Sequence, residues 1–311
     1  MTILLTGATG FIGSHLLEAL IKKKDNKTIL LKRSTSSTWR VNSLLSKVKT
    51  YNIDNLNNIE GIFRENSIET IFHLATLYIK QHTNEEDIVR MNQANILFPS
   101  LLLECAEKYK VKTFINTGTL FEYKTSRNKI TEESPLEAHN YYAATKLAFE
   151  QILKYYNNSS NLKIFTLRLF YPYGEKDNAK VIPHIMRAFI KEERLNLSEG
   201  RQKLNFTYVN DIVDAYLKTI RYINSDKYKH YEVFNIGTDK VYSIRQIVNI
   251  IKHIAKKNIP VKFGAFPYGS NEIMYTNCDY KKANKLLGWF PKIDIEQGLQ
   301  RTYNYYQHEN D

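Results

Sequence analysis

The sequence predicts an α/β protein in which a doubly wound parallel sheet precedes a smaller C-terminal α/β lobe. Short β-branched runs alternate with amphipathic stretches through the first half of the 311-residue chain, a pattern typical of parallel strands joined by crossover helices. Three evenly spaced glycines follow the first of these runs. From about residue 172 the elements become shorter. We therefore expect two domains, residues 1–170 and 171–311, with some later segments returning to the main sheet.

Strands are expected where β-branched and apolar residues gather. The six candidates of the first half are residues 2–7, 27–33, 47–53, 69–75, 112–118 and 162–169. Between the first two, apolar residues from Ile12 to Ile21 share one helical face, and the intervals 86–109 and 140–157 are long enough for helices. Later elements are expected as helices near 181–192, from Asp211 and from Ser243, and as strand segments at 194–198, 206–210 and 233–237.

Composition and charge indicate a globular protein with a basic surface. Hydrophobic residues make up 43% of the chain, and no run approaches the ~18 apolar residues of a membrane span. The two cysteines, Cys105 and Cys278, favour a reducing compartment over a disulfide scaffold. Because the N-terminus enters a strand at once, we expect no signal peptide and a cytoplasmic protein. The net charge of +12 comes from scattered lysines, so we expect a solvated surface or attraction of an anionic small molecule, and no nucleic acid, membrane or metal.

The segment GATGFIG lies between the first strand and the first helix. Gly7 permits a tight turn, Gly10 lets the backbone approach a pyrophosphate, and Gly13 lets the helix pack against the strand. The helix N-terminus adds positive potential for the phosphates. A glycine-rich turn without a ligand is the alternative, but the strand before and the helix after favour a Rossmann-type dinucleotide-binding loop.

The glycine spacing resembles that of the short-chain dehydrogenase/reductase superfamily, specifically its extended branch of nucleotide-sugar epimerases, dehydratases and reductases. The resemblance continues along nearly the whole chain. HLAT (73–76) is similar to the family's HLAA strand end, and LGWFPKIDIEQGL resembles its LGW-x-P ending. Asn95 matches the asparagine that opens the central helix, and Asp54 the acid that caps the adenine amino group. The cofactor residues expected in this way are Gly7, Thr9, Gly10, Phe11, Ile12, Gly13, Lys32, Arg33, Ser34, Ile53, Asp54, Leu74, Ala75, Thr76, Asn95, Tyr142 and Lys146.

The end of the second strand bears on the choice of nicotinamide cofactor. An acid there would accept the ribose hydroxyls of NAD, but this strand ends in Lys32, Arg33 and Ser34. Two cations and a hydroxyl suit a 2′-phosphate better. A solvent-facing Lys-Arg pair is the alternative. The sequence therefore favours NADP(H), with NAD(H) possible.

Tyr142 and Lys146 are four residues apart on a predicted helix and share one of its faces. A phenol titrates near pH ~10, and a nearby ammonium with an oxidised nicotinamide would stabilise the phenolate and lower that pKa. An exposed Tyr/Lys pair is the alternative for this spacing alone. Tyr141 would need a lysine at the position of Thr145, so it is excluded as the donor.

The segment FINTGTLFEY resembles the family's Ser/Thr-rich strand end. Counting back four residues from Tyr123 reaches Thr119, where the superfamily places the hydroxyl that binds the reacting oxygen. Thr119, Tyr142 and Lys146 thus resemble the Ser/Thr–Tyr–Lys triad. In the family's 4,6-dehydratases an Asp and a Glu follow the threonine, but here Leu120 and Phe121 stand there. This departure argues against elimination of water.

The second half resembles the family's sugar-nucleotide side with several departures. LRLFYPYG (167–174) is similar to LRxxNxYG with Tyr171 in place of asparagine, and KVIP (180–183) is similar to the segment that lies against the nucleotide. In GRQKLNFTYVND (200–211) a Leu-Asn pair replaces Arg-Asp, and Gly269 stands where relatives have a diphosphate-binding arginine. The expected substrate residues are Tyr171, Lys180, Val181 and Arg201, the last or Lys180 supplying the missing charge.

These patterns imply reduction of the 4-keto group of a nucleotide-linked 4-keto-6-deoxyhexose with NADPH, as in deoxysugar biosynthesis. A nucleotide-sugar 4-epimerase with tightly bound NAD is the alternative, and a non-enzymatic sensor on this fold is a third hypothesis. The helices at about 95–109 and 140–157 resemble those that pair in a dimer interface of this branch, so we expect a homodimer. The alternative is that their apolar faces only pack on their own sheet.

Overall fold

The central sheet has seven strands in the order β11-β6-β5-β4-β1-β2-β3. They are β1 (Thr2–Thr6), β2 (Lys27–Lys32), β3 (Lys49–Asn52), β4 (Thr70–His73), β5 (Thr113–Thr119), β6 (Lys163–Leu169) and β11 (Glu232–Ile236). β1 pairs in parallel with β2 and β4, β2 with β3, and β4 with β5. The strand order reverses between β1 and β4, which in doubly wound sheets creates a ligand-binding crevice at the carboxyl ends of the strands. The predicted fold class is confirmed.

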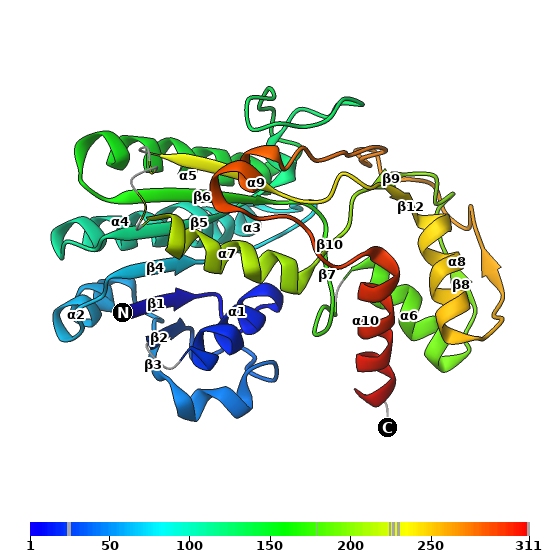
Figure 1. Ribbon diagram of the computed structural model, residues 1–311, viewed down its shortest axis with the longest axis horizontal. Helices are drawn as coiled ribbons and strands as arrows, with labels where there is room; N and C mark the ends of the chain where they lie inside the picture. Colours follow the sequence, from blue (N-terminus) through cyan, green and yellow to red (C-terminus); the bar gives the residue numbers. More distant parts are fainter. Residues whose placement is uncertain (24–25, 179, 224, 226–227, 229–230, 310–311) are drawn as a thin grey trace. The chain divides into compact units, whose positions relative to one another are not determined.

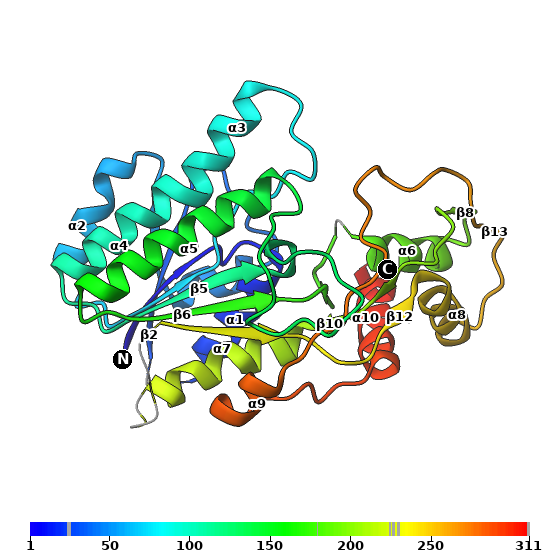
Figure 2. The ribbon, with the colours of Figure 1, turned by 90° about the horizontal axis from the view of Figure 1, so that it is seen from above.

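Helices lie on both faces of this sheet. Figure 2 shows α4 and α5 on one face and α1 and α7 on the other in the computed structural model, which describes residues 1–23, 26–178, 180–223, 225, 228 and 231–309. The helical segments are α1 (Phe11–Lys22), η1 (Asn42–Lys47), η2 (Leu56–Asn58), α2 (Ile59–Glu65), α3 (Glu85–Asn92), the π-helical turn η3 (Gln93–Leu97), α4 (Phe98–Lys108), η4 (Leu120–Glu122), α5 (Tyr141–Ser159) and α7 (Val209–Ile223). Apolar side chains of the sheet, α2, α4 and α5 form one continuous buried cluster.

Two of these elements differ from the sequence-based expectation. The third strand begins at Lys49 instead of residue 47, because residues 42–47 form a 3-10 helix in which no residue is buried. The helix expected over 86–109 is interrupted by the π-helical turn at 93–97. Such turns often lie at functional sites, and this one carries Asn95.

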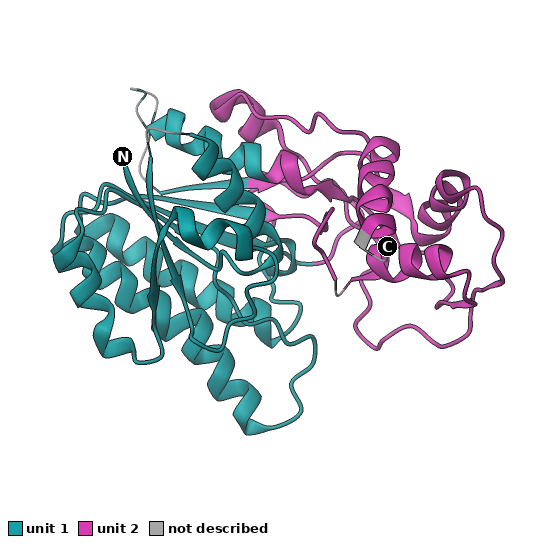
Figure 3. Cartoon of the chain, turned by 90° about the horizontal axis from the view of Figure 1, so that it is seen from below, with its two compact units in different colours: residues 1–124, 135–168, 213–234 teal, residues 125–134, 169–212, 235–311 magenta. Residues whose placement is uncertain are grey.

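The chain divides into two compact units, coloured in Figure 3. Unit 1 comprises residues 1–124, 135–168 and 213–234, and unit 2 comprises residues 125–134, 169–212 and 235–311. Residues 213–234 thus follow position 170 in the sequence and yet belong to unit 1. The assignment of residues 1–170 to the cofactor and 171–311 to the substrate stays a prediction.

Unit 2 consists of short strands and helices. The strands are β7 (Pro172–Tyr173), β8 (Leu195–Asn196), β9 (Lys203–Leu204), β10 (Thr207–Tyr208), β12 (Tyr242–Ser243) and β13 (Val261–Lys262), and the helices are α6 (Val181–Lys191), α8 (Ile244–Ala255), α9 (Lys281–Leu287) and α10 (Ile295–Glu309), most of them labelled in Figure 1. α6, α8 and α10 pack against one another. Ser243 starts α8 with a capping box, and buried Trp289 of the LGW segment donates its indole hydrogen bond to the Asp211 carbonyl at 2.8 Å.

Two further sequence features have a place in this fold. Both Cys105 and Cys278 are buried and form no disulfide. Among the described residues, no helix combines the length and apolar character that crossing a bilayer requires.

Candidate active site

The glycine loop connects β1 to α1 beside the end of β4. Gly7 has φ +73°, and a Cβ there would lie 2.5 Å from the Ala75 nitrogen. A Cβ on Gly13 would lie 2.1 Å from the Gly7 carbonyl oxygen. Larger residues at either position would therefore displace backbone. This close packing of strand, loop and helix N-terminus has the form of a pyrophosphate cradle, so the residues present fit a dinucleotide.

The predicted adenosine end lies at the ends of β2 and β3. The Ser34 amide donates to Asp54 Oδ1 at 2.9 Å, and Lys32 Nζ donates to Asn52 Oδ1 at 2.8 Å. Ile53, which precedes Asp54 in the chain, is buried. Asp54 thus fixes the turn that carries the side chains of Arg33 and Ser34, which are exposed. An adenine-capping role for Asp54 stays a prediction.

Arg40 is a candidate cofactor residue that the sequence alone did not indicate. Its guanidinium donates to the Thr9 carbonyl of the glycine loop at 3.3 Å and lies over the Trp39 ring. Only the fold brings it there, because 31 residues separate it from Thr9. It adds a cation beside the glycine loop.

Asn95 connects the loop after β4 to helix α5. Its side-chain oxygen accepts hydrogen bonds from the Thr76 hydroxyl and the Leu77 amide, and its side-chain nitrogen donates to the Leu77 carbonyl and to Thr145 Oγ1. Thr145 in turn donates to the Tyr142 carbonyl. The π-helical turn therefore places the Asn95 side-chain amide where it binds both the loop after β4 and helix α5. These hydrogen bonds hold Leu74, Ala75 and Thr76 beside the glycine loop.

Thr119 ends β5 and caps the short helix η4. Its Oγ1 accepts from the Phe121 amide at 3.3 Å, and its own amide donates to Glu122 Oε1 at 2.8 Å. This reciprocal capping box fixes the threonine backbone at the end of the strand.

Tyr142 and Lys146 lie in the first two turns of α5, which starts at the cap residue Asn140. Both side chains are buried, at 8% and 2% exposure. Burial raises the pKa of Tyr142, Glu122 raises it further, and a hydrogen bond with Thr76 acts in the opposite direction. Removing the phenol from water disfavours its anion, and a lowering of this pKa by Lys146 together with an oxidised nicotinamide stays a prediction. Burial also lowers the pKa of Lys146, against Glu122 and Glu150, which raise it.

An aromatic layer covers Tyr142. The Tyr78 ring meets it edge-on with a centroid separation of 4.9 Å, and Phe121 stacks on Tyr78 at 6.3 Å. His139 also stacks on Phe121, with a centroid separation of 5.6 Å. Neighbouring Tyr141 has other partners, since its hydroxyl exchanges hydrogen bonds with the Asn92 amide. The two adjacent tyrosines therefore occupy distinct environments.

Next to the predicted triad in the fold lie three buried charged residues, Glu122, Glu150 and Arg168. The Arg168 guanidinium in β6 contacts Glu122 Oε2 at 2.7 Å and both carboxylate oxygens of Glu150. All three side chains are at most 3% exposed. Two features of the sequence are consistent with this cluster. Glu150 follows Lys146 by one helical turn, and Arg168 interrupts an apolar strand, where a buried charge needs a partner.

The predicted substrate residues all lie in unit 2. Lys180 precedes α6, and its ammonium group contacts the Pro172 carbonyl at 3.0 Å and Asp177 at 3.7 Å. Val181 begins that helix, and Tyr171 adopts a left-handed φ of +31° with its ring against Phe206. Arg201 has other partners, Glu199 and the Tyr268 hydroxyl. The structure thus groups Tyr171, Lys180 and Val181 around the β7–α6 connection and gives Arg201 a separate ion pair.

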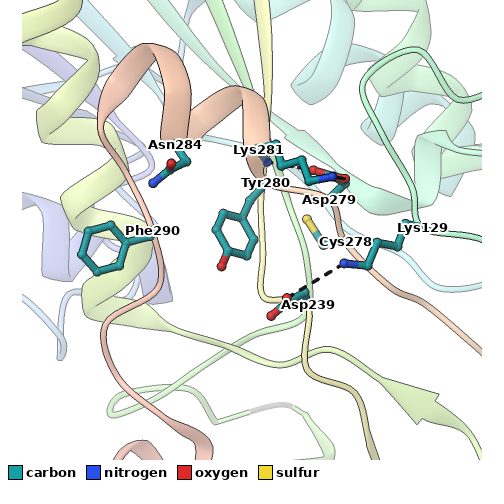
Figure 4. Close-up of a pocket in the computed structure, with 8 residues that line it drawn as sticks. All are labelled: Lys129, Asp239, Cys278, Asp279, Tyr280, Lys281, Asn284 and Phe290. Carbon is teal, nitrogen blue, oxygen red and sulfur yellow. Dashed lines mark hydrogen bonds and ion pairs between the residues drawn. The ribbon is translucent and has the colours of Figure 1, made fainter.

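A pocket with a volume of about 380 Å³ lies in unit 2. Figure 4 shows its lining, which comprises Lys129, Asp239, Cys278, Asp279, Tyr280, Lys281, Asn284 and Phe290. Burial raises the pKa of Cys278 well above its ordinary value, so its thiol stays protonated. None of the predicted site residues lines this pocket.

The fold and the geometry of unit 1 define a class of protein, the dinucleotide-binding α/β proteins of the extended short-chain dehydrogenase/reductase type. The chain belongs to the NAD dependent epimerase/dehydratase family, whose family model matches residues 3–237.

Two curated relatives match over nearly their full lengths. CDP-abequose synthase from Salmonella muenchen is 31% identical over 96% of both chains. A putative UDP-glucose 4-epimerase from Methanocaldococcus jannaschii is 28% identical over 99% of both chains.

Among solved structures, UDP-glucuronic acid 4-epimerase from Bacillus cereus in complex with UDP-glucuronic acid and NAD superposes with a TM-score of 0.89. It is 25% identical and covers 99% of this chain and 100% of that chain. UDP-glucose 4-epimerase with UDP-glucose from Thermotoga maritima has a TM-score of 0.84 and is 27% identical.

Proposed function

We propose that this protein reduces the 4-keto group of a nucleotide-linked 4-keto-6-deoxyhexose. The orientation of Glu122 supports this reaction most directly. Glu122 is the one acid among the four residues that follow Thr119, and its carboxylate is fully buried against Arg168 and the Thr119 amide. The two preceding side chains, Leu120 and Phe121, carry no proton to exchange. The segment thus offers no acid or base for elimination of water, and hydride chemistry at a single carbon remains.

The chain's own residues have distinct tasks in this reaction. Thr119 holds the keto oxygen, and Tyr142 donates the proton that this oxygen needs as the carbonyl becomes an alcohol. The raised pKa of Tyr142 keeps the phenol protonated at neutral pH, which suits a proton donor. Lys146 supplies the positive charge that stabilises the phenolate left behind. The glycine loop would hold the pyrophosphate of a nicotinamide dinucleotide, which supplies the hydride when bound.

The aromatic layer over Tyr142 supports a deoxysugar. Tyr78 and Phe121 present ring surface beside the phenol, and such surface favours an apolar group such as a C6 methyl over a hydroxyl or carboxylate. The match to CDP-abequose synthase, whose name denotes formation of a deoxysugar nucleotide, points the same way.

A nucleotide-sugar 4-epimerase is the second candidate, because relatives of that name match the whole chain. The reaction would be tested by incubating the protein with a panel of nucleotide-linked 4-keto-6-deoxyhexoses and NADPH. We expect loss of nicotinamide absorbance in proportion to the alcohol formed. Conversion of a nucleotide hexose into its 4-epimer without net consumption of NADPH would replace the reductase by the epimerase.

We propose NADP(H) as the cofactor, because Lys32 ends β2, Arg33 directly follows it, and Arg40 reaches the glycine loop. The NAD complexes of structural neighbours make NAD(H) the alternative. Replacing Arg33 by Ala is expected to lower kcat/KM for NADPH roughly tenfold or more, since a charge-assisted phosphate contact contributes about 1.5–3 kcal/mol, and to leave NADH little affected. Arg64→Ala, which removes an exposed side chain of α2, is the control. Equal losses with both cofactors, or a native preference for NADH, would contradict this assignment.

The remaining assignments stay predictions. A homodimer through α4 and α5 and a cytoplasmic location are expected from the sequence.

A further inference from the structure

Glu122 joins two parts of the candidate site that are distant in sequence. Its Oε1 accepts from the Thr119 amide at 2.8 Å, and its Oε2 accepts from Arg168 Nε at 2.7 Å. Both oxygens therefore accept hydrogen bonds, and burial and Glu150 raise the pKa of this carboxyl while Arg168 lowers it. One side chain at 0% exposure thus fixes the backbone of Thr119 and contributes negative charge behind the triad.

The buried charges around Glu122 balance only when Lys146 is counted with them. When both carboxyl groups are ionised, Glu122 and Glu150 supply two negative charges, and Arg168 supplies one positive charge. Lys146, also buried, is the fourth member, and both glutamates act on it electrostatically. Two positive and two negative charges then sum to zero. Since an unbalanced buried charge is costly, this balance favours a positively charged Lys146.

The local backbone is adapted to this cluster. Gly118 lies in β5 next to Thr119, and a Cβ there would come within 2.8 Å of Arg168 Cγ and 3.1 Å of Glu122 Oε1. A glycine in the interior of a strand costs stability, so the close passage of the Arg168 side chain gives a reason for its presence. The Arg168 guanidinium also lies over the Tyr123 ring at 4.7 Å.

We propose that Glu122 is a positioning residue for the reaction, which sets the place of Thr119 and supplies the buried negative charge that balances the Lys146 ammonium group. Its two functions use different atoms and can be separated. The hydrogen bond to the Thr119 amide needs an acceptor at the right distance, whereas the effect on Lys146 and Tyr142 needs only the charge. This role rests on Tyr142 as the proton donor of the proposed function, and it is independent of which sugar is reduced.

Removing the negative charge of Glu122 is expected to change the pKa of both neighbouring groups in the same direction. Glu122 raises the pKa of both Tyr142 and Lys146, so its neutralisation lowers both. The basic limb of the pH profile of kcat/KM, which reports this coupled pair, then moves to lower pH. Five further titratable groups interact electrostatically with Tyr142 or with the buried charged cluster. They are His73, Tyr78, Tyr123, Tyr216 and Tyr231. Burial keeps His73 neutral by lowering its pKa well below the ordinary value.

Two substitutions separate the charge from the geometry. Glu122→Gln keeps an oxygen that can accept from the Thr119 amide, and we expect its basic limb to move down by about one pH unit. Glu122→Asp keeps the charge but is too short to reach both partners, so we expect kcat to fall about tenfold or more at every pH with the basic limb in place. Glu104→Gln, which removes a carboxylate on α4 that binds the Tyr156 hydroxyl, is the matched control and is expected to leave the profile unchanged.

A second measurement makes the test independent of turnover. Protein labelled with [13C]tyrosine at the ring carbon that bears the hydroxyl gives a resonance for Tyr142, assigned by its absence in Tyr142→Phe. We expect this resonance to begin titrating at lower pH in Glu122→Gln than in the native protein. Failure to reduce any 4-keto sugar would overturn the proposed function and leave this result intact. If folded Glu122→Gln shows the native titration of the Tyr142 resonance and the native basic limb of the pH profile, the proposed role of Glu122 is overturned. If that variant does not fold, a native kcat in Glu122→Asp would overturn it instead.

Discussion

Replacement of Tyr142 by Phe is expected to lower kcat by about 10²–10⁴-fold, the usual contribution of a positioned proton donor. The reason is chemical, because the phenylalanine ring can keep the packing against Tyr78 but has no proton for the keto oxygen. The affinity for NADPH, measured by fluorescence titration, is expected to change little. The rate would be followed as sugar-dependent oxidation of NADPH under saturating substrate.

The adjacent tyrosine provides a matched control. Tyr141→Phe removes the same atom one residue earlier on α5, where the hydroxyl exchanges hydrogen bonds with Asn92. We expect kcat within about twofold of the native value for this variant, because a partly buried neutral hydrogen bond contributes only about 0.5–1.5 kcal/mol to stability. Similar losses in both variants, or unimpaired turnover by Tyr142→Phe, would rule out Tyr142 as the donor.

Replacement of Arg168 by Met is expected to lower the free energy of unfolding by about 3–5 kcal/mol, since it leaves buried Glu122 and Glu150 without their shared cation. Denaturant unfolding followed by circular dichroism would measure this loss. Burial and Glu150 raise the pKa of Glu122, and Arg168 opposes them, so removing the arginine raises that pKa further. A carboxyl whose folded-state pKa is raised loses stability as the pH rises through that value. The deficit should therefore be smallest in acid and grow toward neutral pH.

The control for this prediction is an exposed arginine of the same unit. Arg64 forms an ion pair with Glu60 on α2 with a side chain 73% exposed, and its replacement by Met is expected to leave the unfolding midpoint nearly unchanged. If Arg168→Met were as stable as the native protein at neutral pH, Glu122 would not carry a charge there, and its effect on Lys146 would have to be abandoned.

Local patterns of the sequence predicted the main elements well. The glycine loop, the strand at 2–7 and the helix after it depend on spacing and periodicity, which neighbouring residues determine, and β1 and α1 occur there. Ser243 at the start of α8 is a capping signal of the same local kind. The π-helical turn at 93–97 was not predicted, because it depends on Asn95 binding residues 76 and 77 on one side and Thr145 on the other.

In the candidate site, too, the local features were predictable and those that depend on tertiary packing were not. The spacing of Tyr142 and Lys146 and the position of Thr119 were evident from the chain, because a helical turn and a strand end are local features. The extent to which burial raises the pKa of Tyr142 could not be predicted from the chain, since burial depends on everything packed around the phenol.

By itself the sequence determined which residues could do chemistry and in what order they occur on strands and helices. Only the tertiary structure decided that Glu122 points inward to Arg168 and that Arg40 reaches the glycine loop. The physical reason is that desolvation, ion pairing and long-range hydrogen bonds depend on distances between residues far apart in the chain, which local spacing does not fix.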